Sequence, residues 1–441
     1  MRQHSRWLRL LAVLLGLSLI AAACGDDDDT EVEDEGAQQE DGEESAAPEV
    51  GEAAPTCEGE SDGTLTLGGL LPETGNLAFL GPPEFAAAEL AAQHVNEAGG
   101  VLGNDVVWMS GDSGDTTTDI ANQTVNRHLN AGADAIIGAA SSGVSFTVID
   151  AITGACKIHF SPANTSPDFT DYDDDDLYFR TAPSDVLQGR VLADLAASEG
   201  VETMAILALQ DPYGEGLLEF TILPFEEGGG EVVVDQVYDP QAQNFDAEVD
   251  EVVSADPDAL VLIGFDESSR ILTSLFEAGF TPDEKTIYLV DGNIGNALGE
   301  DFDEEGALVG IKGTLPAAEI TDEFREQLLE IDPELIDFSY GPETYDAVII
   351  TALAAVAAES DNPAEMATHI NGITRDGTEC TDFAECRDLL EQGEDIDYNG
   401  PSGPQTFSQA GEPTEASFAI LSYGPDNQID DSQTEYQFAQ L

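Results

Sequence analysis

The chain has 441 residues, of which 90 are Asp or Glu and only 13 are Lys or Arg, so its formal net charge at pH 7 is −77. Proteins that bind nucleic acid neutralise phosphates with a basic patch. The few scattered basic residues supply no such patch, so we expect no nucleic-acid partner. We interpret the acidity as an adaptation to a saline habitat, where salt screens the repulsion between like charges.

Residues 1–23 have the pattern of a secretory signal peptide, with a basic leader, a short apolar run and small residues at its end. The apolar run from Leu10 to Ile20 is too short to span a membrane, which needs about 20 apolar residues. Three alanines precede Cys24, and this stretch resembles the lipobox of bacterial lipoproteins, in which the cysteine is lipidated. An ordinary signal peptide with an incidental cysteine is the alternative. We expect the mature protein to lie outside the cytoplasmic membrane, anchored by acyl chains at Cys24.

Residues 24–63 consist mainly of Asp, Glu, Gly, Ala, Gln and Pro. Such a segment buries too little apolar surface to offset its ordering entropy, so we expect a disordered acidic tether. Repulsion between like charges extends the segment and holds the folded region away from the membrane. A calcium site at Asp26–Asp29 is conceivable, but a solvated acidic face is the simpler interpretation.

Four cysteines lie outside the lipobox: Cys57, Cys156, Cys380 and Cys386. An even number of cysteines in an exported chain favours disulfides over metal binding or catalysis. Cys380 and Cys386 are close enough along the chain to form a small loop together, which leaves Cys57 to pair with Cys156. Zinc is a weak alternative because the five histidines are scattered, and we expect no metal site.

From Thr64 onward, short apolar runs alternate with longer amphipathic stretches. The expected strands are Leu65–Leu71, Val106–Met109, Ala135–Ile137, Ile158–Ser161, Met204–Leu209, Val232–Val237, Leu260–Ile263 and Thr286–Val290. The expected helices are Pro83–Ala98, Thr117–Asn130, Val144–Ala155, Ser184–Ser198, Glu215–Glu227, Ala247–Ser254, Ser268–Ala278 and Pro342–Glu359. This alternation predicts an α/β fold with parallel sheets covered on both faces. Two such units meet near Thr181–Pro183, and residues 401–441 are expected to form turns and short strands.

Ligands of open α/β sheets bind beyond the carboxyl ends of the strands. The loops that follow the expected strands contain eight candidate ligand-binding residues: Leu80, Ser141, Ser142, Ala163, Thr165, Tyr213, Phe265 and Asp291. No histidine falls in these loops, so Ser142 lacks the base that a nucleophilic serine requires. The chain also lacks the glycine-rich phosphate-binding motifs. We therefore expect a binding protein without catalytic activity or cofactor.

The candidate residues suit a small zwitterion. The hydroxyl groups of Ser142 and Thr165, together with free N–H groups at the start of the adjacent helix, would hold a carboxylate. An ammonium group would be accepted by the Asp291 carboxylate and the Ala163 carbonyl. An apolar wall for the ligand's side chain would come from Leu80, Tyr213 and Phe265.

Each polar candidate also has a structural explanation. Ser142 would cap a helix, Thr165 would shape a turn, and Asp291 would stabilise the turn that it forms with Gly292. Taken one at a time, these residues favour the structural explanation. Their shared position at strand ends of both units is what favours a ligand site.

From about Thr64 to the C-terminus, the chain resembles the type 1 substrate-binding proteins of ABC importers, in the branch that binds leucine, isoleucine and valine. The resemblance rests on the order and spacing of LTLGGLLPETG, AAQHVNEAGGVLG, DAIIGAASSG, FSPANTSPDFT, FRTAPSDVLQG, YGEG and LVDGNIGNALG. It implies two doubly wound lobes joined by a three-segment hinge. Lobe 1 would comprise residues 64–182 and 317–400, and lobe 2 would comprise residues 183–316 and 401–441.

The resemblance also implies roles for single residues. The family's carboxylate-holding serine falls at Ser142 or its neighbour Ser141, and the acid that receives the α-ammonium group falls at Asp291. The other ligand contacts of the family fall at Ala163, Thr165, Tyr213 and Phe265. The sequence departs from the family at two places: the acid is often Glu, and an aromatic residue usual in the first loop is replaced near Leu80.

These features predict a monomeric, lipid-anchored receptor outside the cell membrane. It would capture an amino acid, branched-chain or otherwise aliphatic, and deliver it to an ABC permease with its ATPase subunits. One alternative is a sensor whose ligand-bound form is read by a signalling partner. Another is a binder of an amide, a urea or an aromatic acid, and a secreted hydrolase is the remaining possibility.

Overall fold

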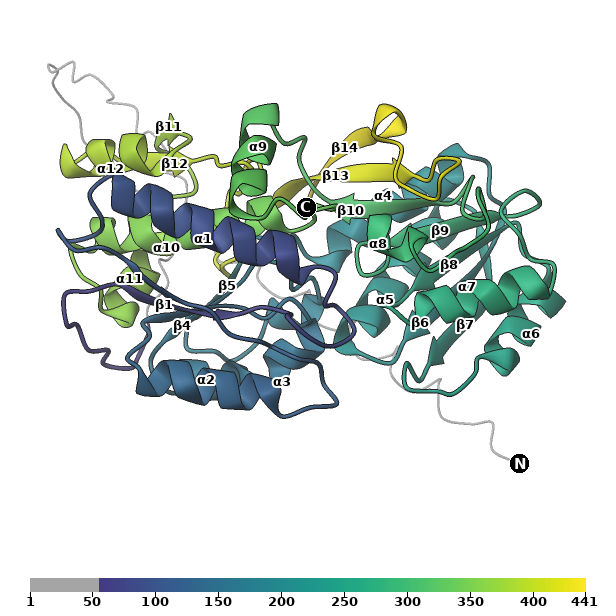
Figure 1. Cartoon of the computed structure of the whole chain (residues 1–441), viewed down its shortest axis with the longest axis horizontal. Coiled ribbons are helices and arrows are strands. Elements are labelled where there is room, and N and C mark those ends of the chain that lie inside the picture. Colours follow the sequence, from purple (N-terminus) through teal and green to yellow (C-terminus); the bar gives the residue numbers. More distant parts are fainter. Residues whose placement is uncertain (1–54) are drawn as a thin grey trace, which may run out of the picture. The chain divides into compact units, whose positions relative to one another are not determined.

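The structure, a computed structural model, describes residues 55–441, which form two β-sheets with helices on both faces (Figure 1). The first sheet has the strand order β2-β1-β3-β4-β5, and all its neighbouring strands are parallel. Its strands are β1 (Thr66–Leu70), β2 (Val107–Met109), β3 (Ala135–Gly138), β4 (Ile158–Ser161) and β5 (Tyr178–Arg180). Two helices pack against each other on one side, and two more cover the other side: α1 (Gly81–Glu97) with α10 (Gly341–Ala357), and α2 (Ile120–Asn130) with α3 (Ser142–Thr153).

The second sheet has the strand order β14-β13-β10-β9-β8-β6-β7. Its strands are β6 (Thr203–Leu209), β7 (Glu231–Tyr238), β8 (Ala259–Ile263), β9 (Thr286–Val290), β10 (Lys312–Pro316), β13 (Glu415–Ser422) and β14 (Glu435–Gln440). Five helices lie between β5 and β10 along the chain: α4 (Asp185–Ser198), α5 (Pro212–Glu227), α6 (Asp246–Ala255), α7 (Ser268–Glu277) and α8 (Asn296–Gly299). The remaining elements are α9 (Asp322–Ile331), α11 (Pro363–Ile370), α12 (Phe383–Glu391) and the small pair β11 (Thr378–Cys380) and β12 (Ile396–Tyr398).

The α/β fold with two doubly wound units is confirmed, and β4 and β9 have the expected bounds. Two details of the expectation were wrong. The second sheet is not wholly parallel, because β13 pairs antiparallel with both β10 and β14. The C-terminal segment also contains an eight-residue strand, β13, where only short strands were expected. Both differences arise because the last two strands extend the second sheet at its edge without a crossover helix.

The parallel strands of the two sheets follow the same order. The sequence β2-β1-β3-β4-β5 in the first sheet corresponds to β7-β6-β8-β9-β10 in the second. In a sheet of this order, the chain connections run in opposite directions on the two sides of the boundary between β1 and β3, and likewise between β6 and β8. A crevice opens at this boundary, beyond the carboxyl ends of the strands. The topology therefore predicts that the loops after β1 and β3, and those after β6 and β8, border a ligand site.

Residues 55–63 are held against the folded region. The expectation that the disordered tether extends to residue 63 was therefore wrong. A disulfide joins Cys57 to Cys156, and a second joins Cys380 to Cys386, which confirms both expected pairs. The Asp361 carboxylate accepts hydrogen bonds from the backbone N–H groups of Gly63 (2.7 Å) and Thr64 (2.8 Å). These contacts help to offset the entropy that the segment loses when it becomes ordered, which its small apolar surface alone does not offset. The expected signal peptide, Cys24 and Asp26–Asp29 lie outside the described residues.

The division into lobes remains a proposal, and the packing bears on where its third boundary falls. Phe407 packs with Phe160 in the core beside the first sheet. The chain joins the second sheet at Glu415, where β13 begins. We therefore place the last crossing near residue 414 instead of residue 401.

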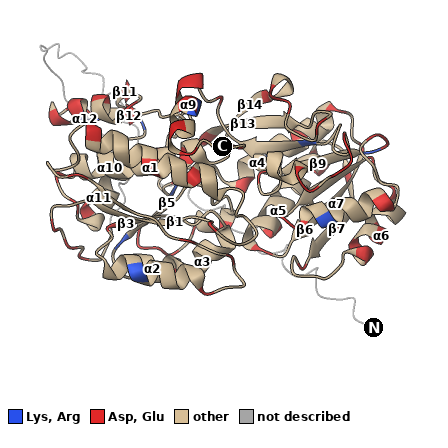
Figure 2. Ribbon diagram, in the orientation of Figure 1, with Lys and Arg blue, Asp and Glu red and all other residues tan. Residues whose placement is uncertain are grey.

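Lysine and arginine residues occupy a few separate positions along the ribbon, among many acidic residues (Figure 2). The described chain accordingly presents no cationic surface of the kind that holds a nucleic-acid backbone. Within residues 55–441, no helix combines the length and the apolar character that crossing a membrane requires.

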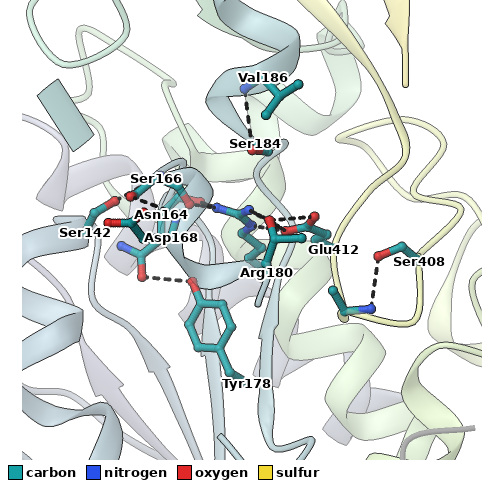
Figure 3. Close-up of polar contacts among 12 residues, drawn as sticks. Ser142, Asn164, Ser166, Asp168, Tyr178, Arg180, Ser184, Val186, Ser408 and Glu412 are labelled. Atoms are coloured by element: carbon teal, nitrogen blue, oxygen red, sulfur yellow. Dashed lines mark hydrogen bonds and ion pairs between the residues drawn. The ribbon is translucent and has the colours of Figure 1, made fainter. Parts of the chain in front are cut away.

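Arg180, the last residue of β5, is fully buried and forms an ion pair with Glu412. Its guanidinium group also donates hydrogen bonds to the carbonyl oxygens of Asn164 (3.2 Å) and Ser166 (2.7 Å), as Figure 3 shows. A buried guanidinium group requires a counter-charge and hydrogen-bond acceptors, and this one has both. The pair connects the loop after β4 to a segment more than 200 residues away along the chain.

We predict that Glu412→Gln lowers the free energy of unfolding by about 3–5 kcal/mol, because it leaves the buried Arg180 charge without a partner. Urea denaturation of the two proteins measures the difference. Asp256→Asn is the matched control, since it removes the exposed partner of Lys285 in a surface ion pair, and such pairs contribute little. Equal effects of the two substitutions would contradict the importance of the buried pair.

His159 lies in the middle of the fully buried strand β4. Its ring packs edge-on against Tyr178, with the ring centroids 5.2 Å apart. Burial lowers the pKa of His159 to about 4, and the backbone of Gly138 offsets this only in part. His159 is therefore a structural residue that remains neutral at physiological pH.

We predict that His159 makes the protein less stable as the pH falls from about 6.5 to about 4. In this window the unfolded chain binds a proton at His159 and the folded chain does not, which costs about 3 kcal/mol by pH 4. Urea denaturation of wild type and His159→Phe at a series of pH values tests this. The difference in stability between the two proteins should change across this window and stay constant above it. A constant difference throughout would show that the buried ring does not titrate as inferred.

Candidate functional site

A small cavity of about 20 Å³ lies where loops from the carboxyl ends of both sheets meet. All eight candidate residues identified in the sequence line it: Leu80, Ser141, Ser142, Ala163, Thr165, Tyr213, Phe265 and Asp291. Four further residues complete the lining: Leu77, Ala140, Gly292 and Tyr340. The structure thus brings together every residue selected for a ligand site, and their contacts with a ligand stay a prediction.

The two serines on the first-sheet side have different surroundings. Ser141 caps α3, because its hydroxyl oxygen accepts a hydrogen bond from the backbone N–H of Val144 (3.3 Å). The Ser142 hydroxyl oxygen accepts one from the backbone N–H of Ser166 (3.3 Å). The helix-capping explanation considered for Ser142 therefore applies to its neighbour. Ser142 keeps its hydroxyl hydrogen for another acceptor in the cavity.

The Arg180–Glu412 ion pair holds the loop that contributes Ala163 and Thr165. Arg180 donates to the carbonyl oxygens on either side of Thr165, those of Asn164 and Ser166. The Asn164 side chain in turn donates to the carbonyl oxygens of Ala139 and Ala140 at the end of β3. The two loops of the first sheet that line the cavity are thus fixed to each other by buried hydrogen bonds.

Asp291, directly after β9, is the acidic residue of the cavity lining. One carboxylate oxygen accepts from the Tyr213 hydroxyl (2.8 Å) and the Gln188 side-chain amide (2.8 Å), and the other accepts from the Tyr340 hydroxyl (2.7 Å). Burial raises the pKa of Asp291, and these three donors counteract the rise. The donors stabilise the ionised form of Asp291, which is the form that can pair with a cationic group of a ligand.

The rest of the cavity wall is largely apolar. The rings of Tyr213 and Phe265 are nearly parallel, with centroids 5.6 Å apart and an interplanar angle of 6°. Leu77 and Leu80 lie on the first-sheet side and are almost fully buried. A small cavity with apolar walls and a few polar groups in fixed positions is typical of a site for a small organic solute.

Two residues that shape this site were not among the candidates expected from the sequence. Tyr340 lies beyond the strands and helices used to select candidates, in a region expected only to add helices, so no strand end marked it. Asp185 is the first residue of α4, and an acidic residue there is explained by the helix dipole alone. A possible signal for Tyr340 was the Gly341–Pro342 helix start that follows it.

Asp185 is fully buried close to Asp291. Among the described residues, neither of its carboxylate oxygens has a hydrogen-bond partner. The Thr165 hydroxyl lies near enough to stabilise the Asp185 charge without meeting the geometry of a hydrogen bond. Burial, followed by the charge of Asp291, raises the pKa of Asp185 well above its usual range. An unpaired buried carboxyl group beside the cavity is an additional acceptor for a cationic group of a ligand.

Contacts near the cavity also join segments that belong to different sheets. The Ser166 hydroxyl, after β4, donates to the carbonyl oxygen of Pro212 at the start of α5 (3.1 Å). Gly143 in the first turn of α3 faces Asp211, and a Cβ built on this glycine would lie 2.1 Å from the Asp211 carboxylate. Only glycine permits this approach. The start of α5 is therefore seated against the same loops that line the cavity.

The family model described as a periplasmic binding protein matches residues 64–424. A curated relative, the chemotactic signal transduction system substrate-binding protein BasB of Halobacterium salinarum, is 24% identical over 372 residues, which cover 79% of this chain and 84% of BasB. Among solved structures, the chain is similar to the branched-chain amino acid transporter substrate-binding protein LivJ of Streptococcus pneumoniae in complex with isoleucine. That pair has a TM-score of 0.69 and 21% identity, covering 85% of this chain and 99% of LivJ.

A solute-binding protein of an R. palustris ABC transporter, in complex with 4-hydroxybenzoate, has a TM-score of 0.71 and 14% identity. The similarity covers 86% of this chain and 98% of that protein. The relatives named here are binding proteins, and they include more than one ligand class. Because the family model spans most of the chain, and the fold is that of the type 1 members, this chain belongs to the periplasmic binding protein family, as its sequence motifs indicated.

Proposed function

We propose that this protein captures an amino acid with a branched-chain or other aliphatic side chain and delivers it to an ABC permease. The main support is the Asp291 carboxylate. It has three hydrogen-bond donors, lies in a small apolar cavity, and shares that cavity with the hydroxyl groups of Ser142 and Thr165. One end of the cavity suits an ammonium group and the other a carboxylate, as an amino acid requires.

In this proposal, Ser141, Ser142, Thr165 and the first turn of α3 hold the α-carboxylate. Asp291 and the Ala163 carbonyl oxygen accept the α-ammonium group, and Asp185 lies behind them as a further acceptor. Charge-assisted hydrogen bonds of this kind are stronger than neutral ones, and more so in a site that excludes water.

The lining of the cavity supports an aliphatic side chain. The ligand's side chain would pack against Leu77, Leu80, Tyr213 and Phe265. Asp in place of the Glu usual in this family shortens the acid by one methylene group, which moves the ammonium group toward the Asp291 side.

Binding would shift a population of open and closed forms toward the closed one. Residues that follow strands of both sheets line the cavity, so a ligand gains its full set of contacts only when these loops meet. A ligand that binds the closed form better favours closure by its difference in affinity. No reaction takes place on this chain, and ATP is used by partner subunits inside the cell.

The proposed location is the outer side of the cell membrane, with acyl chains at Cys24 as the anchor and a monomer as the working state. The family to which the chain belongs acts outside the cytoplasm, which supports this location. The composition of residues 1–24 supports the anchor.

A second candidate function is sensing, in which a signalling partner reads the closed form. BasB, which its name assigns to a chemotactic signal transduction system, matches most of this chain and supports this alternative. An aromatic acid is an alternative ligand, supported by the structural neighbour that holds 4-hydroxybenzoate.

We predict that Asp291→Asn weakens leucine binding at least about 100-fold, because the buried ammonium group loses its counter-charge. Isothermal titration calorimetry measures the affinity, and circular dichroism checks the fold. Asp266→Asn is the matched control, since Asp266 is an exposed acid in the loop that contains Phe265. If Asp291→Asn binds leucine as wild type does, the proposed ammonium site is wrong.

Transport and sensing differ in what the loss of this protein does to a cell. For a transport protein, we expect a deletion strain to lose high-affinity uptake of radiolabelled leucine and to regain it when the gene is restored. Unchanged uptake together with a lost behavioural response to leucine would instead support the sensing role.

A further inference from the structure

A second and larger cavity lies between α9 and the antiparallel strands β13 and β14 (elements labelled in Figure 1). Its volume is about 230 Å³. Its walls come from the end of β10, from α9 and the loop that follows it, and from one face of β13. Nothing in the proposed function uses this cavity.

Tyr340 separates the two cavities, because it lines both of them. Its hydroxyl group donates to Asp291 on the side of the smaller cavity. Its backbone has a φ of 59°, a left-handed conformation that is uncommon for a bulky residue. A ligand in the larger cavity would therefore contact the opposite side of the residue that supports the proposed ammonium site.

Arg325 of α9 is the basic residue in the lining of the larger cavity. Its guanidinium group lies over the ring of Phe338, 4.3 Å from the ring centroid. No carboxylate of the described chain lies within ion-pairing distance of it, although 90 acidic residues are available in the sequence. A guanidinium group fixed on an aromatic ring, with its N–H groups unpaired, is suited to bind a carboxylate in bidentate fashion.

The acidic residues in the lining of this cavity form no ion pair with Arg325. Both carboxylate oxygens of Asp337 accept hydrogen bonds from the backbone N–H of Asn296. Burial raises the pKa of Glu343 to about 8, so this group is uncharged at neutral pH. Asp431 is exposed at the rim. Arg325 therefore has no ion-pair partner among the described residues, and an acidic residue lies at the rim of the cavity.

The remaining surfaces are apolar. Ile336 and Tyr436 are 50% and 46% exposed at the mouth of the cavity, and Ala419 and Leu421 of β13 form part of the wall. A largely apolar lining with a few fixed polar groups is typical of small-molecule sites. We infer that this cavity is a second ligand site, for a small organic carboxylate whose anionic group binds Arg325 and whose apolar body packs between α9 and β13.

The test uses the purified full-length protein and two probes that lack an ammonium group, benzoate and 4-methylpentanoate. We expect calorimetric titration to give saturable binding of at least one probe, at one site per chain. Arg325→Gln should weaken this binding at least about tenfold, because it removes a charged hydrogen-bond donor. Ala318→Trp, which fills the cavity and leaves the arginine in place, should abolish it.

Two further variants make the result specific. Arg270→Gln is the matched control, since Arg270 also lies over a phenylalanine ring, that of Phe245, but away from this cavity. It removes the same charge and should leave the affinity within about twofold of wild type. Asp291→Asn, which alters the smaller cavity, should also retain the binding. This result separates the second site from the proposed amino acid site.

Absence of saturable binding of either carboxylate in wild type would overturn the inference. So would binding that survives Arg325→Gln but not Asp291→Asn, because the carboxylate would then occupy the smaller cavity. If wild type self-associates in sedimentation experiments and Arg325→Gln makes it monomeric, the cavity is an interface between copies of this chain and the inferred ligand site is wrong.

Discussion

The buried ion pair between Arg180 and Glu412 is the interaction on which the site most depends. A guanidinium group removed from water is costly unless its charge and its N–H groups are all satisfied. Here the acid supplies the charge, and the carbonyl oxygens of Asn164 and Ser166 supply the acceptors. These two carbonyl groups flank Thr165. The requirement to satisfy one buried cation therefore determines the path of the loop that lines the cavity.

The environment of Asp291 complements this arrangement on the side of the second sheet. Its three donors come from Gln188 of α4, Tyr213 of α5 and Tyr340 at the start of α10. These elements are far apart in the sequence, and the carboxylate is where they converge. A buried acid with so many donors is held in one orientation, which is the preorganisation that a binding site requires. Asp185 has no such donors among the described residues, so the two neighbouring acids differ in their hydrogen-bonding surroundings.

Repetition of one strand order in both sheets explains why the candidate residues converge. Each sheet places a crevice beyond the carboxyl ends of its strands, and the cavity lining comes from loops that follow β1, β3 and β4 in one sheet and β6, β8 and β9 in the other. The antiparallel strands β13 and β14 lie outside this repeat. Together with α9 and the end of β10 they enclose the larger cavity.

The amino-acid sequence by itself determined the local structure and the candidates that follow from it. Apolar runs bounded by glycine, proline and polar residues predicted β4 and β9 with their observed bounds, and the residues chosen after the strands are eight of the twelve that line the smaller cavity. Only the tertiary structure decided the rest. The pairing of Arg180 with Glu412, the position of Tyr340 and the isolation of Asp185 depend on residues far apart in the chain. Periodicity and turn signals report only on neighbours, whereas burial and charge pairing are properties of the packed chain.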